Sequence, residues 1–253
     1  MKRLTALLMA ALLVLAVCAA IAEGPVAPVI VEELPEWLNA PSQQEKTEGI
    51  VCGDFEYQLL DDGTAGIIAY TGRDKMLTLP DVLDGVPVSA ICTRAFSGNG
   101  KLTEVVIPEG ITHLGNAAFS SCRKLTSVTL PNSLVQLGEN PFVNCGKLTE
   151  FRLSPEHPAL AVENSMLCNR AEQTLICCLP ALEENDCTVP EGILTIGCDA
   201  FSSCSTLNAI TLPDSLTVIG DRAFAACTSL TALELPASLK TIGEEAFRSC
   251  SAL

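Results

Sequence analysis

Large apolar residues recur at a step of 23 positions within two uninterrupted runs of the chain. A phenylalanine that follows Ala or Pro marks the step at Phe96, Phe119, Phe142, Phe201, Phe224 and Phe247. Further apolar residues follow in the spacing Leu-x-x-Val-x-Leu, at Leu102, Val105 and Ile107; Leu125, Val128 and Leu130; Leu148, Phe151 and Leu153; Leu207, Ile210 and Leu212; Leu230, Leu233 and Leu235. A period of about 20–30 residues is typical of a solenoid, because each unit is too short to bury its apolar side except against its neighbours.

The same spacing predicts the structure of one unit. Leu-x-x-Val-x-Leu is expected to form a short strand that pairs with the equivalent strand of the next coil. A proline ends the strand because it cannot donate to the ladder, at Pro108, Pro131, Pro213 and Pro236. A later glycine can supply a turn, at Gly115, Gly138, Gly220 and Gly243. We therefore expect a β-rich repeat solenoid, a horseshoe or right-handed coil on a parallel sheet, with the phenylalanine inside.

The consensus Cys-x-x-Leu-x-x-Val-x-Leu-Pro-x-Ser-Leu-x-x-Ile-Gly-x-x-Ala-Phe resembles the BspA-type leucine-rich repeat of bacterial surface and secreted proteins. The resemblance covers residues 77–253. Residues 53–65 are similar to that family's N-terminal hairpin. The pattern predicts its two strands at Phe55–Leu60 and Thr64–Tyr70, with a tight turn at Asp62-Gly63. The resemblance implies adhesion to host or matrix proteins.

The chain divides into four predicted parts. Residues 1–22 are a signal peptide, 23–49 a flexible linker, 50–76 a hairpin cap and 77–253 the solenoid. The 23-residue period is interrupted at 154–186, where Met166–Cys168 and Thr174–Leu179 predict an inserted hairpin. This hairpin is either a packing variation of one coil or a protruding edge that binds a partner. The array stops at Leu253 before a strand is complete, so we expect the chain to be truncated there, with more repeats or an anchor beyond.

The first residues predict export. Lys2 and Arg3 precede an apolar run, and Ala20-Ile21-Ala22 fits cleavage after Ala22. The alternative is lipoprotein attachment at Cys18, although Val17 before it is not a small residue. We expect a secreted or cell-surface protein with no membrane span in the mature chain.

The net charge and the absence of catalytic motifs disfavour several classes of function. A formal charge of −15 disfavours nucleic acid, whose phosphates it repels. The two histidines, His113 and His157, have no partner motif for a catalytic triad or a zinc site, and no phosphate loop follows a strand. We expect no enzymatic activity, no catalytic residue, no metal and no cofactor.

Thirteen cysteines invite a metal or redox interpretation. Five of them occupy one place in the repeat: Cys122, Cys145, Cys204, Cys227 and Cys250. A small buried residue explains that period, and residues stacked side by side suit a disulfide poorly, so we expect these five to be free and buried. Cys177 and Cys178 lie in the insertion, and we expect one to face inward and one outward. The pattern leaves open the disulfide state of Cys52, Cys92, Cys168, Cys177, Cys178 and Cys198.

The predicted function is protein binding through the outward residues of the sheet, with an unidentified extracellular protein or matrix component as partner. These residues are Thr103, Glu104, Val106, Thr126, Ser127, Thr129, Thr149, Glu150, Arg152, Asn208, Thr211, Thr231 and Glu234. They include no aromatic anchor, which favours weak multivalent contact or none. Two alternatives remain open: an inert surface scaffold, and a spacer or targeting module for an enzyme domain beyond residue 253.

Overall fold

The computed structural model describes residues 49–180 and 185–253. The predicted signal peptide, Cys18 and all but the last residue of the predicted linker lie outside these ranges. The described residues form short strands joined by turns, and none of them is helical. The expected β-solenoid with parallel sheets is confirmed.

The N-terminal end is an antiparallel cap. β2 (Phe55–Leu59) and β3 (Ala65–Tyr70) form the predicted hairpin, and β1 (Ile50–Cys52) pairs with the free side of β2. A second hairpin follows, β5 (Val82–Leu83) and β6 (Val86–Ile91), turning at Asp84 and Gly85 with φ of 48° and 82°. β6 then pairs in parallel with β3 and joins the cap to the first full coil.

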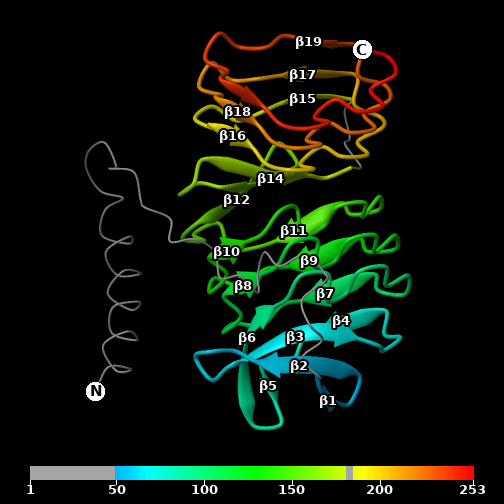
Figure 1. Cartoon of the computed structure of the whole chain (residues 1–253), viewed down its shortest axis with the longest axis vertical. Coiled ribbons are helices and arrows are strands. Elements are labelled where there is room, and N and C mark those ends of the chain that lie inside the picture. Colours follow the sequence, from blue (N-terminus) through cyan, green and yellow to red (C-terminus); the bar gives the residue numbers. More distant parts are fainter. Residues whose placement is uncertain (1–48, 181–184) are drawn as a thin grey trace, which may run out of the picture. The chain divides into compact units, whose positions relative to one another are not determined.

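The Leu-x-x-Val-x-Leu stretches form the first side of the solenoid. β4 (Met76–Thr78), β7 (Glu104–Val106), β9 (Ser127–Thr129) and β11 (Glu150–Arg152) stack in parallel, as Figure 1 shows. Glu104 lies opposite Ser127, and Ser127 opposite Glu150, so the sheet register equals the sequence step of 23. Val105 and Val128 point inward and are fully buried.

Each coil also has a second strand, which the apolar spacing did not predict. On this side β6 is followed by β8 (His113–Leu114) and β10 (Gln136–Leu137) in parallel. These strands contain two residues each and end at the repeated glycine. A strand this short shows no alternation of its own, so the repeat pattern could not distinguish it from a turn.

The insertion separates two stacks. β12 (Leu160–Glu163), β13 (Met166–Asn169) and β14 (Thr174–Cys178) form the expected inserted hairpin with one additional strand. β14 then begins a new parallel series with β16 (Thr195–Ile196), β18 (Val218–Ile219) and β20 (Thr241–Ile242). On the first side β15 (Asp186–Thr188), β17 (Ala209–Thr211) and β19 (Ala232–Leu233) form a separate sheet.

Two hydrophobic cores accompany the two stacks. In the first core Phe96 and Phe119 stack with ring centroids 4.8 Å apart. In the second core Phe224 lies between Phe201, at 4.9 Å, and Phe247, at 5.4 Å. Each phenylalanine therefore fills its coil as expected and contributes stacking contacts to the next coil.

Candidate functional site

The predicted sheet face is divided between the two stacks. Its first nine residues lie on or beside β7, β9 and β11, and the last four lie on or beside β17 and β19. No ladder joins β11 to β15 in the described residues, so the face consists of two sheets. Most of its side chains are exposed or half-buried, whereas Ser127 is buried.

Threonine hydroxyls on this face are bonded to the coil below. Thr126 Oγ1 donates to Thr103 O at 2.8 Å, and Thr149 Oγ1 donates to Thr126 O at 3.1 Å. Thr103 and Thr231 make the equivalent bonds to Lys75 O and Asn208 O. Each hydroxyl is therefore held in one orientation by the solenoid itself.

Arg152 connects side chains of β7 and β11 on the sheet face. Its guanidinium lies 2.6 Å from Glu104 Oε1 on β7 and 2.8 Å from Glu150 Oε2 on β11. Because β9 lies between those strands, the arginine side chain crosses β9, the strand that carries the buried Ser127. The two carboxylates raise the pKa of Arg152.

A different surface is formed by the turns between the repeated glycine and cysteine. Each turn reverses direction through two residues with positive φ, except the turn at Asn140, which has only the second. The first is Arg94, Ala117, Asp199, Arg222 or Glu245, and the second is Gly98, Ser121, Asn144, Ser203, Ala226 or Ser249, all with φ between 52° and 74°. Such conformations are uncommon for residues other than glycine, so coil-to-coil packing must hold them.

Successive turns line one groove of about 1030 Å³. Six turns contribute to it: Thr93, Arg94 and Ser97; Asn116, Ala117, Ser120 and Ser121; Glu139, Asn140, Val143 and Asn144; Asp199 and Ser202; Arg222, Ala225 and Ala226; Arg248 and Ser249. The repeat pattern did not predict this surface. The available signal was the variable pair inside Gly-x-x-Ala-Phe, which is polar or small in most repeats.

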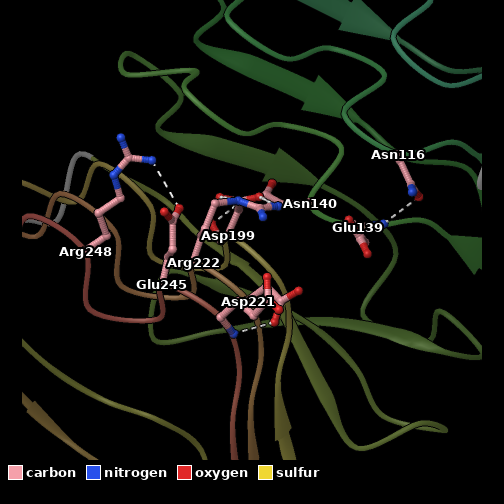
Figure 2. A network of polar contacts seen from close by, with 9 residues as sticks. Asn116, Glu139, Asn140, Asp199, Asp221, Arg222, Glu245 and Arg248 are labelled. Carbon is pink, nitrogen blue, oxygen red and sulfur yellow. Dashed lines mark hydrogen bonds and ion pairs between the residues drawn. The ribbon is translucent and has the colours of Figure 1, made fainter. Parts of the chain in front are cut away.

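Polar contacts lie within and between the turns of the groove, as Figure 2 shows. The Arg222 guanidinium donates two hydrogen bonds to the Asp199 carboxylate, from Nη2 to Oδ2 at 3.0 Å and from Nε to Oδ1 at 3.3 Å. Arg248 Nη1 donates to Glu245 Oε2 at 3.1 Å. The Glu139 backbone N–H donates to Asn116 Oδ1 at 2.8 Å. The Glu139 carboxylate makes no ion pair with another described residue, and its side chain is exposed.

The groove passes across the boundary between the stacks. Asn140 Nδ2 donates to Asp199 O at 2.8 Å, and Asn140 Oδ1 accepts from the Phe142 N–H at 3.0 Å. In neighbouring coils the phenylalanine N–H donates instead to the next coil, as Phe119 N does to Pro141 O at 2.8 Å. Asn140, which is buried, therefore replaces a missing ladder bond with its side chain.

The repeated cysteines have a structural role, because they contact the neighbouring coil. Cys122, Cys145 and Cys227 each direct Sγ toward the phenylalanine carbonyl of the coil below, at 3.1–3.2 Å. All twelve described cysteines are free thiols. Four of the five repeated ones are buried as expected, and Cys250 is half-buried. Burial raises the pKa of Cys92 to about 12, which makes it a poor nucleophile.

The expectation for Cys177 and Cys178 was wrong. Both are buried, with exposed fractions of 2% and 7%. The pair does alternate, but Cys177 packs in the first core and Cys178 in the second. β14 lies between the two cores, so neither of its faces meets water.

In the part of the chain that the structure describes, no group of three or more His, Cys, Asp or Glu side chains is arranged to hold a metal ion. His157 is buried by backbone contacts, with Nε2 3.0 Å from Pro131 O. The described residues also contain no helix that could cross a membrane.

Comparison with known proteins agrees with this architecture. The BspA type Leucine rich repeat region model matches six copies over residues 87–172 and 181–253. No curated protein shows significant similarity to the chain.

Solved leucine-rich repeat structures are similar at low identity. Pneumococcal vaccine antigen PcpA is 17% identical, with 81% of this chain and 80% of that chain covered and a TM-score of 0.52. A leucine-rich repeat protein from Eubacterium ventriosum is 18% identical, with 80% and 69% covered and a TM-score of 0.51. A leucine rich cell surface protein from Faecalibacterium prausnitzii is 20% identical, with 83% and 82% covered and a TM-score of 0.49.

Proposed function

Because the chain belongs to the BspA-type leucine-rich repeat family, we propose that it is a secreted or cell-surface protein-binding module without enzymatic activity. The proposed partner is an extracellular protein or matrix component. The sheet face defined above is the proposed contact surface. Export rests on the signal-like residues 1–22.

The observation that carries this proposal is the preorganised sheet face. Four of its threonines, Thr103, Thr126, Thr149 and Thr231, are held by hydrogen bonds to the coil below. Arg152 is held by two carboxylates. Fixed side chains lose little conformational entropy on association. The same bonds occupy the hydroxyl protons of these four threonines, so a partner would meet their methyl groups, the Glu150–Arg152 ion pair and the exposed charge of Glu234.

The test is binding of the mature chain to a panel of purified extracellular-matrix proteins. The double variant Glu150→Lys, Glu234→Lys reverses two exposed charges on the face, and we expect the affinity of any bound protein to fall about tenfold through lost complementarity. Glu191→Lys, also exposed but in a turn outside the face, is the matched control. Retention of full affinity by the double variant would exclude this face as the contact surface.

A further inference from the structure

We infer that the turn-lined groove binds an extended segment of another polypeptide that places a lysine or arginine opposite Glu139. This inference rests on the protein-binding role proposed above and assigns that role a second face. Nothing in the repeat pattern required such a groove, since the turns only need to reverse the chain.

The dimensions of the groove suit one extended chain. Six turns line it, and coils stacked about 4.8 Å apart give it a length of roughly 24 Å. At about 3.3 Å per residue, the groove accommodates about seven extended residues.

The lining suits a polypeptide backbone. Val143 is the largest aliphatic side chain among the lining residues, and none of them is aromatic. Ser202 offers a hydroxyl group, which can bond to both N–H and C=O. Asn116 and Asn144 offer amide N–H groups, since their Oδ1 atoms already accept from Glu139 N and Ser203 Oγ. Alanines at positions 117, 225 and 226 leave room for side chains that face the floor. Nucleic acid fits poorly, because single strands bind by stacking on aromatic rings.

The charged residues of the groove favour a lysine or arginine in the bound segment. Arg222 and Arg248 are already neutralised by Asp199 and Glu245. The exposed Glu139 carboxylate forms no close ion pair with another described residue. It attracts Arg222 only at longer range, and Arg222 is already paired with Asp199, so Glu139 can pair with a basic ligand residue near the middle of the groove. Arg94 lines the first turn, about 10 Å from Glu139 along the stack. The formal charge of −15 also attracts a basic segment from a distance.

The experiment uses a display library of random linear peptides selected on the immobilised mature chain. We expect enriched peptides to share a lysine or arginine at one position. Ser202→Trp fills the middle of the groove at a residue without positive φ, and should weaken their binding by about tenfold or more. Ser205→Trp, exposed and outside the groove lining, should leave binding unchanged.

Glu139→Arg tests the charge independently of groove filling. Because Glu139 is exposed, the variant should fold, weaken the enriched peptides about tenfold and shift a new selection toward an acidic residue at the same position. Absence of enrichment over uncoated beads would overturn the inference. So would peptides whose binding tolerates both Ser202→Trp and Glu139→Arg.

The sheet-face variants separate this inference from the proposed function. Glu150→Lys, Glu234→Lys should leave peptide affinity unchanged if the groove is the site. Peptide binding that is lost in the sheet-face variant and retained in the groove variants would overturn the inference while supporting the sheet face. Matrix-protein binding that fails while groove-dependent peptide selection succeeds would refute only the sheet-face proposal.

Discussion

At the scale of the residue, the turns keep side chains in a conformation that usually selects glycine. Gly98 occupies the second left-handed position of its coil, where Ala226 and Ser121 occupy the equivalent position with φ of 60° and 58°. The left-handed conformation costs an L-residue roughly 1–2 kcal/mol. The solenoid tolerates this cost because each turn is bonded to the next, as Ala226 N is to Arg248 O at 2.7 Å.

Ala226→Gly should therefore leave the free energy of unfolding unchanged or raise it by up to about 1 kcal/mol. Relief of the left-handed strain opposes the roughly 0.5–1 kcal/mol of entropy that glycine loses on folding. Ala223→Gly is the control, since Ala223 is fully buried in the same turn without positive φ, and should cost about 1 kcal/mol or more. Chemical denaturation measures both, and equal losses would argue against strain at Ala226.

His157 is a residue whose ionisation should affect stability. Its Nδ1 accepts from the N–H groups of Ala159 and Leu160, so the buried ring is neutral with its proton on Nε2. Desolvation lowers the pKa of His157, against the opposing effects of the Pro131 carbonyl and Glu109. The unfolded state therefore binds a proton at a higher pH than the folded state does.

The contribution of neutral His157 to the free energy of unfolding should be complete above about pH 6.5. It should decline as the pH falls below that value toward the pKa of His157 in the folded state. We expect the difference in unfolding free energy between the native chain and His157→Gln to be larger at pH 7.5 than at pH 5.5. Urea denaturation at the two pH values measures it. A difference independent of pH would contradict the neutral-ring assignment.

At the scale of the element, the boundary between the stacks depends on a substitution within one turn. Pro141 stands where other repeats have alanine, and the residue before proline is restricted to extended conformations. Asn140 accordingly lacks the positive φ of its equivalents Ala117 and Arg222. Its side chain then bonds to both Phe142 N and Asp199 O.

Asn140→Ala should reduce the unfolding free energy by about 1–3 kcal/mol, because the buried Phe142 N–H loses its acceptor. Asn116→Ala is the matched control in the preceding coil. It removes a bond to the exposed Glu139 N–H, which water can replace, so its effect should be within about 1 kcal/mol. Thermal or urea unfolding distinguishes them, and equal effects would mean that Asn140 does not support the boundary.

At the scale of the whole described array, each coil contacts chiefly its neighbours. Stability should then be a sum of coil and interface contributions, with a weaker link where β11 and β15 do not pair. The separate cores around Phe119 and Phe224 support this view. A destabilised coil should therefore open its own stack first.

Phe224→Ala should reduce the unfolding free energy by about 3–5 kcal/mol, because it leaves a cavity between Phe201 and Phe247. Thr211→Ala, on the exposed sheet face, should change it by no more than about 0.5 kcal/mol. Hydrogen exchange of Phe224→Ala should accelerate in β16–β20 while β7 and β9 remain protected. Uniform acceleration across both stacks would show that the array unfolds as one cooperative unit.

The fold was predictable because its information is local and repeated. Phe119, Leu125 and Val128 each recur at the same step, and the inward position of one such residue fixes the position of all its equivalents. The cysteine position was also predictable as a small buried site, although the sequence did not reveal the bond from Cys122 Sγ to Phe96 O. The two-residue strands were missed because they contain no periodicity.

The sequence by itself determined the period, the core, the inserted hairpin and the sheet register, since all of these follow from apolar spacing along one chain. Only the tertiary structure decided that Cys177 and Cys178 enter different cores, because burial of both faces of β14 depends on what packs against each side. Only the tertiary structure also placed Glu139, Asp199 and Arg222 along one groove. Those residues are separated by the insertion in sequence, and the stacking of the turns places them together.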